Sequence, residues 1–503
     1  SDCHDMPERF AHSVCSQRNV AHWEKSAMSV APSRPPALSA APSKSVFPLP
    51  LSTMEAFMVT DSRPGYTMAC DLELNFQGRL DRAACEAGLA FALARHPLFR
   101  FTIGPMQDGA LAWQDSGQSP PVQWASLDDP LDDSYGAPFD LTLQPGLRVW
   151  VRRGEDQSKI LLHYHHACSD GLGVNGFAED FLVAYHNAFP GSAPVEPRLL
   201  EMERLLIRGE IGMGVRSAWR KFADVFIGAR EGIKLLLQRP ASIASGDASS
   251  SQAPPARPMR PAFLSIRLSE ATTRGLRQIA SHADATTNDV LIRELFVLLA
   301  RWNEAHGGIS PRRLLRILVP QNLREGDDDK MPLANAIGFA FVTRKAGWRQ
   351  RPAELLASIH RETKAIREGK LSLYFLGGMG TVRAAGLLPA LVNGPFCFAT
   401  AVLTNLGDAT RLFRAALPRA GDDVRVGNVT YQGMVGVPPV RPGTGVVFLI
   451  AYHGTTMSVT YAWDWQRIDP ESGRQILDEY VAQLDALAQQ ADTADAAKEV
   501  SRS

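Results

Sequence analysis

The stretch KILLHYHHACSDGLG, residues 159–173, decides how the rest of the chain is read. Its first part, KILLHYHHA (159–167), is apolar and has the character of a buried β-strand. Gly171 follows and permits a tight bend of the backbone. GFAEDFLVAYHNAF (176–189) then carries apolar side chains at helical spacing. The sequence therefore predicts a strand, a turn and a helix in succession, with polar side chains gathered at the turn.

Adjacent histidines stand where the predicted strand ends. Because side chains alternate along a strand, His163 and His165 would share one face, with Tyr164 and His166 on the other. One imidazole can then face a solvent channel while its neighbour packs inside the protein. A neutral histidine is the usual base for taking a proton from a hydroxyl or amine near neutral pH. Asp170, beyond the turn, is better placed to fix the loop than to relay protons.

Three other interpretations of these side chains stay open. The first is a pair of structural histidines, the usual default for isolated histidine. The second is a zinc site that includes His163 and His165, for which further ligands at a typical spacing are lacking. The third is a Cys168 nucleophile paired with His166, although a small buried residue is the better interpretation of this cysteine. We favour the functional base, because the pattern HHxxxDG is rare by chance.

Outside this stretch the chain alternates between strand-like and helical segments. Further strand-like runs occupy residues 67–76, 147–153, 263–269, 314–324, 397–407, 428–436, 444–454 and 456–464. Helical spacing is found at residues 80–97, 199–237, 271–283, 287–305, 352–369 and 470–491. The pattern predicts an α/β (α+β) protein with mixed sheets.

Composition divides the chain into a leader and two lobes. Residues 1–45 lack a core pattern and predict a disordered leader. Residues 46–240 form the predicted N-terminal lobe, which carries the histidine motif. The polar tract 241–262 predicts an exposed linker, and 263–503 the C-terminal lobe.

Charge and cysteine usage exclude several classes of protein. The chain has 53 basic and 53 acidic side chains, which argues against a nucleic-acid partner held by phosphate neutralisation. The six cysteines form no CxxC pair, and we expect neither a signal peptide nor a membrane-spanning segment. These observations favour a cytoplasmic enzyme with free thiols. Residues 199–239 carry eight basic and five acidic side chains, typical of a lobe-covering helix, with peripheral membrane or lipid contact as the alternative.

HHACSDG (165–171) resembles the HHxxxDG motif of the condensation-domain and chloramphenicol-acetyltransferase-like acyltransferase superfamily. The superfamily includes wax ester synthases, alcohol acetyltransferases and polyketide-associated acyltransferases. Other segments resemble the family in its own order: PLPLSTMEAF (48–57), the run ending in ARHPLFR (94–100), TTNDVLIRELFVLLARW (286–302), VPQNLR (319–324) and NAIG (335–338). The resemblance covers residues 47 to about 490.

The resemblance implies two chloramphenicol-acetyltransferase-like lobes that form a V, with a substrate tunnel at their junction. His166, preceded by His165, would face the tunnel and act as general base. The catalytic motif would comprise His165, His166, Asp170 and Gly171, and Asp170 would form a structural ion pair with Arg324 from the other lobe.

The same resemblance implies further site residues. Asn335 and Gly338 match the NxxG segment and would give structural support. VLTNLGD (402–408) resembles an SNLG-like segment of polyketide-associated acyltransferases and alcohol acetyltransferases. Thr404 and Asn405 would therefore contact the substrate, although hydrogen bonding at a strand end explains them equally well.

The function implied is transfer of an acyl group from a thioester to a hydroxyl or amine acceptor, with O-acylation favoured over N-acylation. The donor would be acyl-CoA or a phosphopantetheinyl carrier, with an acyl carrier protein as one partner, and no cofactor would be tightly bound. Two alternatives stay open. One is an amide-forming condensation enzyme of the peptide-synthetase type, and the other is a catalytically silent docking or scaffold module.

Overall fold

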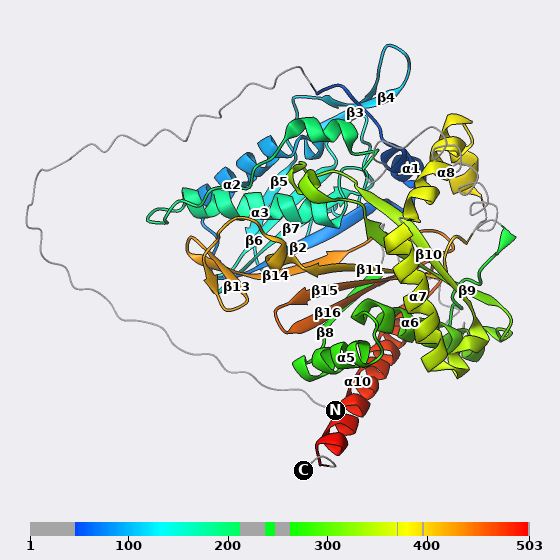
Figure 1. Ribbon diagram of the computed structural model, residues 1–503. Coiled ribbons are helices and arrows are strands. Elements are labelled where there is room, and N and C mark those ends of the chain that lie inside the picture. The colour runs from blue at the N-terminus through cyan, green and yellow to red at the C-terminus, as the bar shows by residue number, and fades with distance from the viewer. Residues whose placement is uncertain (1–45, 212–236, 247–261, 370, 395–396, 501–503) are drawn as a thin grey trace, which may run out of the picture. The chain divides into compact units, whose positions relative to one another are not determined.

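The computed structural model describes residues 46–211, 237–246, 262–369, 371–394 and 397–500 (Figure 1). From Lys44 onward the chain forms one compact unit. The predicted leader, 1–45, and most of the predicted linker, 241–262, lie outside the described residues. The boundaries of the two lobes stay a prediction.

The first large sheet has seven strands in the order β12-β13-β14-β2-β7-β6-β5. Its strands are β2 (Ala69–Gln77), β5 (Val122–Ser126), β6 (Leu147–Arg153), β7 (Gln157–His165), β12 (Arg419–Ala420), β13 (Asp423–Val426) and β14 (Val429–Val437). All neighbours are antiparallel except β5 and β6. Strands from near both ends of the described chain therefore share one sheet, because β14 pairs along β2 from Thr430 opposite Gln77 to Val437 opposite Asp71.

The second large sheet has six strands in the order β10-β9-β11-β15-β16-β8. They are β8 (Ala262–Arg267), β9 (Leu314–Asn322), β10 (Ile337–Lys345), β11 (Ala401–Asp408), β15 (Val446–His453) and β16 (Thr456–Trp463). β11 runs parallel to β9 and β15, and the other neighbours are antiparallel. A small third sheet joins β1 (Leu49–Pro50), β4 (Leu111–Asp115) and β3 (Phe101–Pro105).

Helices cover the sheets (Figure 1). Along the seven-stranded sheet, α2 (Arg82–Arg95) and α3 (Gly171–Ala188) lie side by side. On the six-stranded side, α10 (Pro470–Val500) packs against α5 (Glu270–His282) and α6 (Thr287–Gly307), and α7 (Pro352–Gly369) packs against α6. The shorter helices are α1 (Thr53–Asp61), α8 (Ser372–Ala384) and α9 (Leu388–Asn393). None of the helices in the described ranges is long and apolar enough to cross a membrane.

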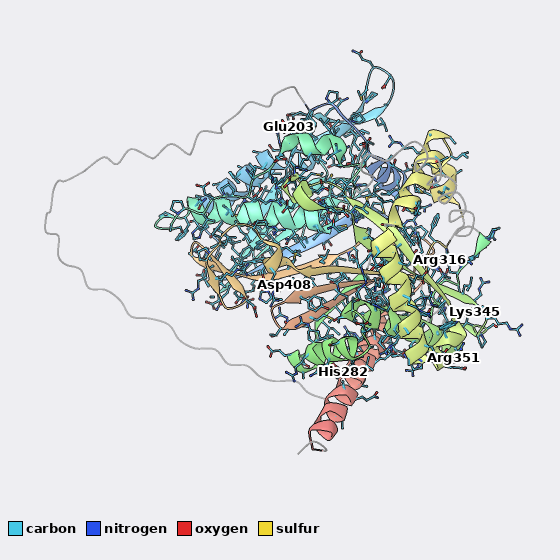
Figure 2. All side chains as sticks on the ribbon, in the orientation of Figure 1. Glu203, His282, Arg316, Lys345, Arg351 and Asp408 are labelled. Atoms are coloured by element: carbon cyan, nitrogen blue, oxygen red, sulfur yellow. The ribbon has the colours of Figure 1, made fainter. Side chains whose placement is uncertain are left out.

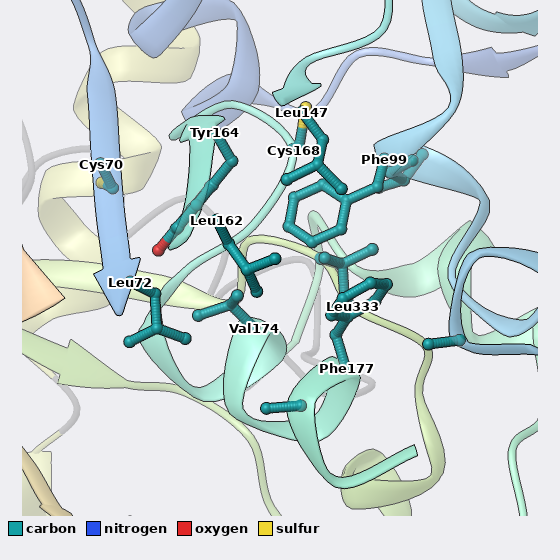
Figure 3. Packing of buried hydrophobic residues seen from close by; sticks show 14 of the residues in the cluster. Cys70, Leu72, Phe99, Leu147, Leu162, Tyr164, Cys168, Val174, Phe177 and Leu333 are labelled. Carbon is teal, nitrogen blue, oxygen red and sulfur yellow. The ribbon is translucent and has the colours of Figure 1, made fainter. Parts of the chain in front are cut away.

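A buried core holds the histidine turn in place (Figure 3). Tyr164 at the end of β7 packs edge-on against Phe99 with 5.5 Å between ring centroids, and Phe99 packs against Phe177 of α3 at 5.1 Å. The three rings are at most 4% exposed. Burial of one such side chain contributes about 1.5–3 kcal/mol, so the strand end and the helix start are held by the same cluster.

The predicted α/β class with mixed sheets is confirmed, and every predicted strand is present to within a few residues. The predicted helix at 199–237 differs. Within the described residues, Met202–Ile207 form a 3-10 helix followed by a turn, and residues 212–236 lie outside the described ranges. The helical spacing there comes from scattered leucines and isoleucines, of which Leu199, Leu206 and Ile207 are exposed.

Candidate active site

His166 is the first residue after β7, and its backbone is fixed on both sides. Its N–H donates to Met68 O at 2.6 Å, and its carbonyl accepts from Asn335 Nδ2 at 2.6 Å. The same amide nitrogen also donates to Ala167 O at 2.8 Å. The turn that carries the imidazole is therefore tied to β2 and to the segment that leads into β10.

The His166 ring lines a pocket while part of it is buried. Nδ1 is buried and makes no hydrogen bond within the described residues, although the backbone of His166 itself and the negative charge of Asp170 favour the protonated ring. Burial is the larger effect and lowers the pKa of His166 below the ordinary value of 6.5. The ring is therefore neutral near pH 7, and Nε2 is the nitrogen left to face the pocket.

His165 is buried and is absent from the pocket lining. Its Nδ1 accepts a hydrogen bond from Ala167 N at 3.1 Å, which leaves Nε2 as the protonated nitrogen. Burial, followed by the neighbouring His166 and His163, lowers the pKa of His165 to about 3. The geometry gives this ring a role in holding the turn.

His163 lies on the same strand face as His165, and its ring also has partners within the protein. Its Nδ1 lies 2.6 Å from Asp71 Oδ1, and its ring stacks on Phe139 with 5.2 Å between centroids. Asp71 also accepts from the hydroxyl of Tyr135 at 2.8 Å. No group of three or more His, Cys, Asp or Glu side chains able to hold a metal is found among the described residues.

Asp170 has both carboxylate oxygens occupied. Oδ2 accepts from Arg324 Nη1 at 2.8 Å and from Ala336 N at 2.7 Å, and Oδ1 accepts from Gly173 N at 2.8 Å as the N-cap of α3. The ion pair expected with Arg324 is thus present. Arg324 also donates from Nη2 to Ala334 O at 2.9 Å. A carboxylate used in this way orders the loop.

Cys168 lies in the core beside Leu147 (Figure 3). Its thiol approaches Gly146 O at 3.9 Å. Burial raises the pKa of the Cys168 thiol well above its ordinary value of 9.0. The side chain is therefore a thiol at neutral pH and has no thiolate to offer as a nucleophile.

Two glycines of the site lie where another element approaches closely. Gly171 is the first residue of α3 and does not have the left-handed backbone that only glycine adopts easily. A Cβ on Gly171 would instead overlap the side chain of Leu406 from β11. A Cβ on Gly338 would lie 2.8 Å from Cβ and 3.1 Å from O of Ser372. Gly171 thus lets β11 lie close to the start of α3, and Gly338 lets α8 lie close to β10.

The pocket beside His166 contains about 1160 Å³ of empty space, with open solvent at its mouth included. His166, Asp170, Gly171, Thr404 and Asn405 all lie in its lining, so the structure brings these expected site residues together. Most of the remaining wall is apolar, including Phe57, Phe339, Phe341, Phe375, Met379 and Phe398.

The aromatic wall was not predicted from the sequence, and neither was Arg441, which also lines the pocket. These side chains come from α1, β10, α8 and two loops, far apart in the chain. The one available signal was the segment 48–57, which includes Phe57.

No family model matches the chain. Among curated proteins, it is 33% identical over 135 residues to one of the linear gramicidin synthase proteins of Brevibacillus parabrevis, covering 24% of this chain and 2% of that protein. It is 25% identical over 284 residues to an uncharacterized protein of Mycobacterium tuberculosis (strain ATCC 25618 / H37Rv), covering 55% of this chain and 62% of that protein. The matched region thus spans less than two thirds of both relatives.

Solved structures match over most of the chain. The condensation domain of the Monacolin K polyketide synthase MokA has a TM-score of 0.62 at 15% identity, covering 88% of this chain and 97% of that one. The starter condensation domain of rhizomide synthetase RzmA, in complex with C8-CoA, has a TM-score of 0.60 at 14% identity, covering 88% and 95%. The X-domain from teicoplanin biosynthesis, in complex with OxyB, has a TM-score of 0.57 at 18% identity, covering 90% and 96%. The chain has the condensation-domain fold, the chloramphenicol-acetyltransferase-like architecture that its HHACSDG motif predicts.

Proposed function

We propose that the protein is an acyltransferase that moves an acyl group from a thioester to a hydroxyl or amine acceptor, with His166 as general base. The observation that carries the proposal is a neutral imidazole in the wall of a largely apolar pocket. The other two ionisable side chains of the lining, Asp170 and Arg441, are each held in an ion pair. His166 is therefore the lining residue available for acid–base chemistry near neutral pH.

The proposed reaction needs one base that later returns its proton. The acceptor oxygen or nitrogen attacks the thioester carbonyl carbon while Nε2 of His166 takes the proton of the acceptor. The C–S bond of the tetrahedral intermediate then breaks, and the thiolate receives the proton from the imidazolium. The products are an ester or amide and a free thiol, so no oxidant or reductant is consumed.

Thr404 and Asn405, in the middle of β11, are proposed to contact the substrate. Asn405 is partly engaged, because its Oδ1 accepts from Gly407 N at 2.9 Å and its Nδ2 lies 3.4 Å from Asn288 Oδ1. Thr404 makes no side-chain hydrogen bond within the described residues. Its hydroxyl is therefore the better donor for a carbonyl oxygen that gains negative charge during attack.

The apolar wall favours an aliphatic acyl group, in keeping with the C8-CoA bound by the RzmA starter domain. We propose acyl-CoA or a phosphopantetheinyl carrier as donor, an acyl carrier protein as a partner in the second case, and no tightly bound cofactor. O-acylation is favoured over N-acylation because of the VLTNLGD segment. Amide-forming condensation of the peptide-synthetase type is the alternative chemistry on the same site.

A catalytically silent docking module is the second candidate, since the X-domain shares the fold and is solved with OxyB. The motif of this chain, with both histidines, Asp170 and Gly171 in place, favours catalysis.

The test is a transfer assay with short, medium and long acyl-CoAs against several alcohols and amines, read by released thiol and by product mass. We expect His166→Ala to lose about 10²–10⁴-fold in rate. His282→Ala is the matched control, because this exposed histidine ends α5 outside the pocket lining (Figure 2). Undiminished transfer by His166→Ala would overturn the base assignment. Failure of the wild-type protein to transfer from any donor, carrier-bound thioesters included, would favour the docking module.

A further inference from the structure

Arg441 places a positive charge in an otherwise apolar part of the pocket. Among the described residues that line the pocket, it is the one Lys or Arg side chain. It lies in the loop between β14 and β15, and its side chain is 15% exposed. The acid–base chemistry proposed for His166 makes no use of it.

The Arg441 guanidinium is held in a defined orientation. Its Nε and Nη2 both contact the carboxylate of Asp61 at the end of α1, with Nη2 2.9 Å from Oδ1, and the Asp61 side chain is fully buried. The guanidinium carbon lies 5.2 Å from the ring centroid of Phe57 and 5.0 Å from that of Phe398. Attraction to the two ring systems adds to the ion pair. A planar group fixed in this way has little freedom to rotate.

One edge of the guanidinium is left for a ligand. Nη1 makes no hydrogen bond to any described residue and is absent from the buried unpartnered atoms there, so it is not fully buried, and it belongs to a side chain that lines the pocket. A donor that faces an apolar ligand would lose its water without gaining a partner, which is unfavourable. A ligand that offers an oxygen at this point avoids that loss.

We propose that Arg441 determines specificity by selecting a substrate whose apolar chain carries a hydrogen-bond-accepting oxygen. The identity of the ligand as a substrate rests on the proposed function, but its binding does not. Asp61 neutralises Arg441, so a neutral carbonyl suffices. Arg63, 3.5 Å from Asp61, adds positive charge nearby and makes a carboxylate acceptable as well. The oxygen-bearing chain belongs either to the acyl part of the donor or to the acceptor.

Two sets of probes distinguish these sources, and neither set requires turnover. The first set is a series of S-alkyl pantetheine thioethers, in which a keto oxygen is moved along the chain, together with the plain alkyl compound. The second set is a matched series of long-chain alcohols with and without a keto oxygen. Dissociation constants are measured by calorimetry on the wild-type chain. We expect one position in one series to bind at least about tenfold more tightly than its hydrocarbon counterpart.

The tighter binding of the oxygen-bearing probe must depend on Arg441. In Arg441→Lys the ammonium stays with Asp61 and the second donor edge is lost, so the ratio of dissociation constants should fall to within about twofold of one. The double variant Asp61→Asn/Arg441→Met removes both charges and should behave in the same way. It is the second test if the lysine variant is poorly folded. Arg301→Lys, an exposed residue of α6 outside the pocket, is the matched control.

A wild-type ratio near one in both series, or a preference that survives both variants, would overturn the inference. Loss of transfer in His166→Ala with the binding preference intact would leave it standing. Absence of any transfer activity, with the preference present, would refute the proposed function and keep Arg441 as a determinant of binding.

Discussion

Nη1 of Arg324 lies 2.8 Å from Oδ2 of Asp170, and this ion pair joins the segment after β9 to the first turn of α3. The Asp170 side chain is 2% exposed and that of Arg324 is 11% exposed. The same carboxylate caps α3 and accepts from Ala336 N. One side chain therefore orders the histidine turn, the helix after it and the strand that follows Asn335.

Asp170→Asn should cost more stability than His166→Ala. The asparagine leaves Arg324 without its carboxylate in a nearly buried place, and breaking such a pair costs about 3–5 kcal/mol. His166 faces the pocket, and its removal should cost less than about 1 kcal/mol. Urea unfolding of both variants measures the difference. Equal losses of unfolding free energy would contradict the structural role of Asp170.

The pH profile of transfer should show a base with a lowered pKa. His166 accepts a proton only when neutral, so kcat/KM is lost as the pH falls through its pKa. Burial places that pKa below 6.5, and the acid limb should therefore lie below pH 6.5. Initial rates across the acid range, with a stable donor, give the limb. An acid limb at or above pH 6.5 would show that the ring is not desolvated as the structure has it.

His165 should contribute to acid lability. In the folded protein its pKa is about 3, whereas the unfolded chain protonates near 6.5. Between these pH values the unfolded state binds a proton at this histidine and the folded state does not. The free energy of unfolding therefore falls as the pH decreases through this window. The slope is about 1.4 kcal/mol per pH unit for one such group. His165→Gln removes the group and should give a shallower decrease in urea midpoints between pH 6 and about 4. Parallel slopes for wild type and variant would count against a buried neutral ring.

Gly173→Ala and Gly377→Ala form a matched pair of helical glycines. A Cβ on Gly173 would lie 3.0 Å from O and 3.1 Å from N of Ala334, whereas a Cβ on Gly377 meets nothing within 4 Å. Alanine is preferred over glycine inside a helix by about 1 kcal/mol. We therefore expect Gly377→Ala in α8 to be neutral or stabilising.

At Gly173 the backbone of Ala334 should outweigh helix preference, with a net loss of about 1–3 kcal/mol. Thermal unfolding of the two variants gives the comparison. A stabilised Gly173→Ala variant would mean that the segment before β10 moves away without cost.

Local pattern predicts elements well where apolar side chains recur at the spacing of the element. The predictions at 147–153 and 352–369 match the bounds of β6 and α7, since both carry regular buried side chains. α8 was not predicted, because SLYFLGGMGTVRA contains three glycines that disfavour a helix. Packing on β10, with Phe375 5.4 Å from Phe339, stabilises it instead.

The candidate site likewise has one part that the sequence predicts and another part that it does not. His166, Asp170 and Gly171 lie within seven residues, and their spacing is visible in the sequence. Phe398 lies in the loop before β11, and Arg441 lies in the loop after β14. Only the tertiary structure brings these two side chains together at the pocket. A short motif therefore indicates the chemistry, while the selectivity of the pocket depends on long-range packing.

The pairing of β14 with β2 has a consequence for how the chain is made and divided. A fragment that ends before residue 429 leaves the edge of β2 without a partner, and open edges of this kind pair with other molecules. The seven-stranded sheet can be completed only after most of the chain has left the ribosome. Expression of the first half alone should therefore give aggregation, and a split version of the protein should recover when the fragment that contains β14 is supplied together with it.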